Sequence, residues 1–215
     1  MSNDNELKQA VLAELTWEPS VNVAHIGVTA KGGVVTLTGH VESFTEKQAA
    51  ETATGRVKGV KAVAEEIEVR LPSEIKCGDE EIATAAIDRL AWDVSVPCNA
   101  VKVKVEKGRV TLAGQVEWYY QKEAAEQDVD GLLGVIGVSN TITIKPRVNA
   151  LNLSDDIMSA LRRSWFDATT IKVTADGGKV RLTGTAHSWH ERDVAASTAW
   201  AAPGATAVEN NITVM

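Results

Sequence analysis

The stretch GVVTLTG at residues 33–39 predicts the fold of the whole chain, because it occurs twice more, as GRVTLAG at 108–114 and GKVRLTG at 178–184. In each copy, apolar residues alternate with other residues between two glycines. This pattern is typical of a half-buried strand that begins at a hairpin turn and ends at a sharp exit. The closing glycines are 75 and then 70 residues apart (114 − 39 and 184 − 114). The chain is therefore predicted to contain three copies of one unit.

The residues around each copy predict five elements in a fixed order. A first helix carries apolar residues at helical spacing, such as Leu7, Val11 and Leu15, and a strand with alternating apolar residues follows it. The glycine-flanked strand comes next, then a second helix and a last strand. The predicted fold class is α+β, with three tandem α-β-β-α-β units, each formed by two helices packed on a three-stranded mixed sheet. The predicted domains are residues 1–72, 73–147 and 148–215.

Two signals mark the helix ends. A capping box, in which a Ser and a Glu three residues later satisfy free backbone N–H groups, is present as Ser43-x-x-Glu46 and as Ser188-x-x-Glu191. A tryptophan is expected to close the first helix of each copy, namely Trp17, Trp92 and Trp165.

The composition is that of an acidic globular protein. The net charge is −7 and no third of the chain is basic, which argues against nucleic-acid binding. Residues 1–6 lack the basic and apolar regions of a secretory signal, and no apolar run approaches the roughly 18 residues that span a bilayer. Cys77 and Cys98 do not form a C-x-x-C pair. We expect a cytoplasmic protein, or a periplasmic one if the first residues are those of a mature exported chain with a new start Met.

The predicted unit resembles the BON domain. The resemblance rests on the α-β-β-α-β order, the motif G-x-V-x-L-x-G, an aromatic residue five positions later and a Gly-Val pair before the last strand, such as Gly59-Val60. It implies a non-enzymatic bacterial protein associated with osmotic stress or the cell envelope, with binding to phospholipid or membranes. Two alternatives stay open: a cytoplasmic protein that responds to potassium or another solute, and a protein–protein scaffold.

Residues that recur in every copy are interpreted as structural. The glycines that close the motif, Gly39, Gly114 and Gly184, are expected to supply unusual backbone conformations rather than to bind a ligand. The aromatic residues five positions later are expected to pack in the core at the start of the second helix, and they are Phe44, Tyr119 and Trp189.

Aromatic residues particular to the middle copy are the candidate binding residues. Trp118 stands where the first copy has Ser43, and Tyr120 stands where it has Thr45, so the shared fold requires neither. Trp and Tyr suit an interface that is apolar on one side and wet on the other, such as a lipid headgroup layer. The lysines expected to attract anionic lipid beside them are Lys102, Lys104 and Lys122. Contact with a neighbouring unit would use the same residues, and both interpretations stay open.

No pattern in the sequence predicts catalysis, a cofactor or a metal site. His187 and His190 are three residues apart, but no third ligand is evident near them. The sequence contains no G-x-S-x-G motif, no P-loop and no triad pattern. We therefore expect a protein that is not an enzyme.

Overall fold

The structure is a computed structural model that describes residues 2–72, 77–146, 152–164 and 168–214. The predicted boundary at residues 147–148 and the predicted helix end at Trp165 lie outside these ranges, and the boundary at 72–73 lies at the edge of one of them.

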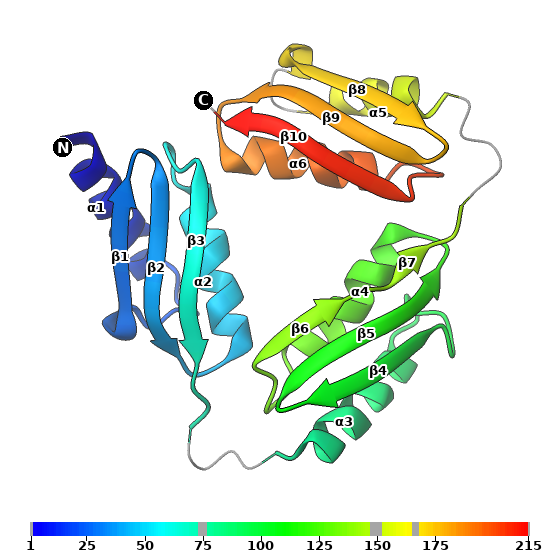
Figure 1. The fold of residues 1–215 in the computed structure, drawn as a ribbon, viewed down its shortest axis with the longest axis horizontal. Coiled ribbons are helices and arrows are strands. Elements are labelled where there is room, and N and C mark those ends of the chain that lie inside the picture. The colour runs from blue at the N-terminus through cyan, green and yellow to red at the C-terminus, as the bar shows by residue number, and fades with distance from the viewer. Residues whose placement is uncertain (1, 73–76, 147–151, 165–167, 215) are drawn as a thin grey trace.

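Each third of the chain forms one unit with the predicted order of elements (Figure 1). The first unit contains α1 (Ser2–Trp17), η1 (Val23–His25), β1 (Ile26–Lys31), β2 (Val34–Val41), α2 (Phe44–Arg56) and β3 (Ala62–Val69). The second contains α3 (Asp79–Trp92), β4 (Val101–Glu106), β5 (Arg109–Val116), α4 (Tyr119–Asp130), β6 (Gly137–Asn140) and β7 (Thr143–Ile144). The third contains α5 (Leu153–Leu161), η2 (Ala168–Thr170), β8 (Ile171–Asp176), β9 (Lys179–Ala186), α6 (Trp189–Trp200) and β10 (Ala207–Val214).

The glycine-flanked strand lies in the middle of each sheet. β2 pairs antiparallel with β1 and parallel with β3, and β9 pairs in the same way with β8 and β10. In the second unit, the edge strand is interrupted, so β6 and β7 both run parallel to β5. The interruption is local, because the Thr141 N–H still donates to the Leu112 carbonyl oxygen at 2.8 Å. Three mixed sheets with two helices each confirm the predicted fold class.

The cores lie between each sheet and its two helices. The central-strand leucines Leu37, Leu112 and Leu182 are each 0% exposed, as the alternation of apolar residues predicts. A two-residue turn joins β1 to β2, with positive φ angles of 61° at Gly32 and 87° at Gly33. Such turns match the twist of paired strands and favour glycine.

The closing glycines lie within the central strands, so the prediction that they end these strands is wrong. Their φ angles are 115° at Gly39, 151° at Gly114 and 126° at Gly184. A Cβ atom at any of the three would clash with a backbone carbonyl oxygen, because the neighbouring antiparallel strand begins alongside. Each central strand then continues for two more residues and ends at a buried Val or Ala. The glycines thus permit a close backbone approach inside a continuing strand.

The three units are arranged around a common middle (Figure 1). The second helices α2, α4 and α6 face this middle, and neighbouring units meet through them.

Candidate functional site

The start of α4 differs from the equivalent helix starts as the sequence predicts. Ser43 and Ser188 each cap their helix by accepting a hydrogen bond at 3.1 Å from the backbone N–H of the Glu three residues later. Trp118 occupies the same position before α4 and provides no side-chain cap. Its side chain is partly buried, whereas that of Tyr120 is 55% exposed.

Two of the candidate lysines lie on a different face from this helix. Lys102 and Lys104 are exposed on β4, while the alternate residues Val103 and Val105 pack on the helix-covered core. Successive side chains of a strand point to opposite faces, so the two lysines lie on the uncovered face of the sheet. Lys104 also forms an ion pair with Glu106 at 3.1 Å. The five candidate residues therefore do not form one patch.

Lys122 occupies a position with a structural role in the sister units. It lies eight residues after Gly114, as Lys47 and Arg192 lie eight residues after their own glycines (122 − 114, 47 − 39 and 192 − 184). The Lys47 ammonium donates to the Ile67 carbonyl oxygen at 2.8 Å, and the Arg192 Nε donates to the equivalent Ile212 carbonyl at 3.2 Å. In the first and third units, the cation at this position thus supports the edge strand. Comparison of the three copies would have revealed this role.

An apolar surface lies instead at the end of α3. Trp92 is 86% exposed, Val94 is fully exposed at 101%, and Ile87 on the same helix is 58% exposed. Trp17 at the equivalent end of α1 is 84% exposed. The prediction that a tryptophan closes the first helix is confirmed for Trp17 and Trp92. Sequence reasoning identified these residues as helix ends and missed their exposure.

A groove of about 330 Å³ lies between α3, β4 and the loop that joins them in the middle unit. In the first unit, Val23 lies in η1 and packs against the core at the equivalent position. In the middle unit this position is Cys98, whose side chain is exposed. The residues that line the groove are Ile87, Leu90, Ala91, Val96, Pro97, Cys98, Asn99, Val101 and Val103.

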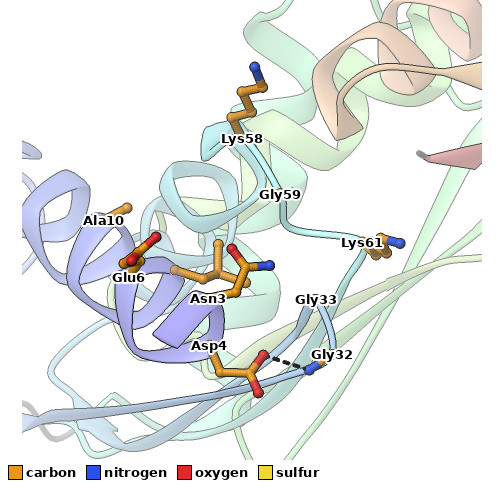
Figure 2. A pocket seen from close by; sticks show the side chains of 10 residues that line it. Asn3, Asp4, Glu6, Ala10, Gly32, Gly33, Lys58, Gly59 and Lys61 are labelled. Carbon is orange, nitrogen blue, oxygen red and sulfur yellow. Dashed lines mark hydrogen bonds between the residues drawn. The ribbon is translucent and has the colours of Figure 1, made fainter. Parts of the chain in front are cut away.

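A second hollow, of about 480 Å³, lies beside the β1–β2 turn in the first unit (Figure 2). There the Asp4 carboxylate accepts a hydrogen bond from the Gly32 N–H at 2.9 Å. Asp79 does the same in the middle unit, and these bonds from the Gly108 and Lys107 N–H groups lower the pKa of Asp79. These first-turn acids therefore fasten the hairpin turn. The residues that line the hollow include the acids Asp4 and Glu6 and the bases Lys58 and Lys61.

The recurring aromatic residues contact the neighbouring units. Tyr119 also packs against the core of its own unit, as predicted, whereas the prediction is wrong for Phe44. Phe44 packs against the core of the second unit. The Tyr119 ring stacks on the Trp200 ring of the third unit, with centroids 4.4 Å apart. Trp189 lies over Gly55 of the first unit. Tyr119, between Trp118 and Tyr120, thus joins two units.

An acidic hollow of about 540 Å³ separates α2 from α4. The Asp130 carboxylate accepts a hydrogen bond from the Gln48 amide at 2.9 Å across it. Burial is the main cause of the raised pKa of Asp130, and the nearby charge of Glu126 raises it further. The residues that line the hollow are Gln48, Glu51, Thr52, Tyr119, Glu123, Glu126, Gln127 and Asp130. Within the described ranges, no group of three or more His, Cys, Asp or Glu residues is arranged to hold a metal ion.

Comparison with known proteins agrees with the repeat. The family model of the BON domain matches three times, at residues 3–70, 78–146 and 149–215. The chain belongs to the BON domain family. Each match coincides with one structural unit, so the units are hereafter BON units 1, 2 and 3.

The chain is similar to osmotically-inducible protein Y of Escherichia coli (strain K12). The two are 31% identical over 147 residues, which cover 66% of this chain and 73% of the relative. Among solved structures, CdsD, a structural protein of the type III secretion system of Chlamydia trachomatis, is 16% identical with a TM-score of 0.28. That alignment covers 98% of this chain and 92% of CdsD. In the BON units as far as the structure describes them, none of the helices is both long and apolar enough to cross a bilayer.

Proposed function

We propose that this chain is a non-enzymatic binding protein, linked to osmotic stress, that associates with phospholipid surfaces through BON unit 2. Membership of the BON family and similarity to an osmotically inducible protein support the stress link. The observation that carries the lipid proposal is the exposed apolar end of α3, where Trp92 and Val94 project into solvent.

The chemistry of this end suits a headgroup layer. A Trp side chain is stable at a membrane interface because its ring is apolar and its indole N–H can be hydrated. Val94 and Ile87 would enter the acyl boundary, where burial of apolar surface contributes about 25 cal/mol per Å². Lys102 lies on the adjoining strand but on the uncovered face of the sheet, away from α3, so its attraction for anionic lipid would act only over a distance. The net charge of −7 opposes this attraction, so the apolar contact must provide most of the binding.

Vesicle flotation tests the proposal. We expect the full chain to float with vesicles of phosphatidylglycerol and phosphatidylcholine, more than with phosphatidylcholine alone and more at low salt. Trp92→Ser with Val94→Ser should abolish flotation, because both exposed apolar side chains are removed. Leu133→Ser is the matched control, because it also removes an exposed apolar side chain of the same unit, one that is 62% exposed. Leu133 lies away from the end of α3, since its neighbour Gly134 lies beside Ile82 near the start of that helix. Flotation that survives the double substitution, or that Leu133→Ser abolishes equally, would exclude the α3 end as the contact.

A cation-responsive role is the second candidate function. It is favoured by the hollow between α2 and α4, whose lining includes Glu51, Glu123, Glu126 and Asp130 and no Lys or Arg. Two measurements distinguish the lipid-binding role from the cation-responsive role. They are flotation and thermal melting, each repeated in potassium chloride and in sodium chloride at equal ionic strength. A melting temperature that rises in potassium alone, without flotation, would favour the cation-responsive role.

A further inference from the structure

Among the described residues, each pair of BON units meets near the same two positions of the second helices. The first is the aromatic residue five positions after the central-strand glycine, at the start of the second helix. The second lies sixteen positions after that glycine, near the end of the same helix (55 − 39, 130 − 114 and 200 − 184). The residues at this second position are Gly55, Asp130 and Trp200.

Each helix start meets the helix end of the next unit. From unit 1, Phe44 packs on the core of unit 2, and Gln48 and Thr45 donate to Asp130 at 2.9 and 3.4 Å. From unit 2, Tyr119 stacks on Trp200 of unit 3. These two contacts join consecutive units, which the chain also links covalently.

The third contact joins the last unit to the first. Trp189 at the start of α6 lies over Gly55, so close that a Cβ on this glycine would be 3.1 Å from the Trp189 ring. No linker connects these two units, so only their surfaces hold them together. The contact also leaves a hollow of about 360 Å³. The residues that line the hollow are Glu51, Thr52, Gly55, Arg56, Trp189, His190 and Asp193.

A contact that pairs one end of a unit with the opposite end of the next is head to tail. Head-to-tail contacts close into a ring when the rotation allows it, and otherwise they join further copies. Here three units close the ring within one chain (Figure 1). If the contact between units 3 and 1 opens, each chain presents a free Trp189 and a free Gly55, which are complementary to those of a second chain.

We propose that the surfaces around Trp189 and Gly55 bind a second copy of this chain, so that open chains join head to tail. The same residues meet in the closed chain and in the joined chains, so the contact itself favours neither state. The ratio of closed to joined chains therefore depends on protein concentration. A tethered partner has an effective concentration of about 1 mM for a short flexible linker. The closed ring therefore dominates at low concentration, and joined chains form when the ring is opened or the chain is concentrated.

Two full-chain variants test the proposal by complementation. Gly55→Leu blocks the receiving surface of unit 1, because its side chain would occupy the space of the Trp189 ring. Trp189→Ala removes the inserted side chain of unit 3. Each variant alone should be monomeric and open, with a larger radius of gyration by small-angle scattering than the wild type. A mixture should form a 1:1 complex of twice the 23.0 kDa chain mass, because one variant keeps Trp189 and the other keeps Gly55.

Light scattering after size exclusion measures the molar mass of the species in the mixture. Each chain is present at 200 µM, about one fifth of that effective concentration. Circular dichroism and a cooperative melt verify folding, and Gly55→Glu replaces Gly55→Leu if the latter does not fold. The control mixes Trp189→Ala with Trp17→Ala, whose exposed tryptophan lies outside the contact. It should contain mainly monomers, because the closed ring of Trp17→Ala competes at the higher effective concentration. Monomers alone in the test mixture, or an unchanged radius of gyration in both variants, would overturn the proposal.

Discussion

BON units 1 and 2 have the same fold and differ where the first helix meets the first strand. In unit 1, η1 carries Val23 onto the core. In unit 2, Cys98 at that position is exposed and lines an open groove, and Val94 is fully exposed where unit 1 has Pro19. The helix-end tryptophan is exposed in both units. The central strand is equally buried in both units. The comparison teaches that the core maintains the fold while the loop at this end is free to acquire a different surface.

The largest expected effect tests the shared part of this comparison. Leu37→Ala in unit 1 and Leu112→Ala in unit 2 should each lower the free energy of unfolding by about 2–5 kcal/mol, because both leucines are 0% exposed and a cavity would remain. Urea unfolding, followed by fluorescence and circular dichroism, measures the loss. A change below about 1 kcal/mol in either unit would show that its central strand is not the centre of its core.

A smaller effect is expected at the starts of the second helices. Ser43→Ala should destabilise by about 1 kcal/mol, because the N–H of Glu46 loses its cap. Trp118→Ser introduces the missing cap into unit 2 and should stabilise by up to about 1 kcal/mol. Comparing the melting temperatures of the two variants with that of the wild type shows whether each one is destabilised or stabilised. A loss of stability in Trp118→Ser would show that the partly buried indole contributes more than a cap does.

The smallest effect concerns pH and has opposite signs at two aspartates. The pKa of Asp79 is lowered by hydrogen bonds from the hairpin turn, so its contribution is present above the ordinary value of 3.8 and is lost as pH falls through the lowered pKa. The pKa of Asp130 is raised by burial. The folded state therefore retains this proton longer, and stability decreases as pH rises from 3.8 through the raised pKa.

Asparagine substitutions separate the two contributions. Relative to the wild type, Asp79→Asn should become less stable as pH rises from about 3 to 6. Asp130→Asn should become more stable, relative to the wild type, over the same range. This range extends from about one pH unit below to about two above the ordinary carboxyl pKa. Urea midpoints at several pH values are the measurement. Parallel pH profiles for the two variants would contradict the assigned environments.

Local patterns predicted the elements that the structure contains. The alternation in the three motif copies identified the central strands, and the two capping boxes identified the starts of α2 and α6. The position of Gly39 within its strand was missed, because the requirement comes from the carbonyl of His25, the residue just before the neighbouring strand β1. A pattern along one segment does not show how closely another segment approaches it.

The candidate site was less predictable. Trp118 and Tyr120 were identified because they differ from the sister copies, yet Lys102 and Lys104 lie on the other face of the sheet. The exposure of Trp92 was missed, because a tryptophan at a helix end can be buried or exposed with the same local spacing.

The sequence by itself determined that this protein has three BON units, the order of their elements and the alternating apolar residues of each central strand. These features follow from short-range periodicity, which is repeated three times and therefore stands out. Only the tertiary structure decided which aromatic residues join the units and which face solvent. The reason is that Trp189 meets Gly55 across more than half of the chain, and the equivalent positions in the other units carry Asp130 and Trp200. Contacts between such distant and chemically different residues leave no periodic signal, so their geometry appears only when the units are packed together.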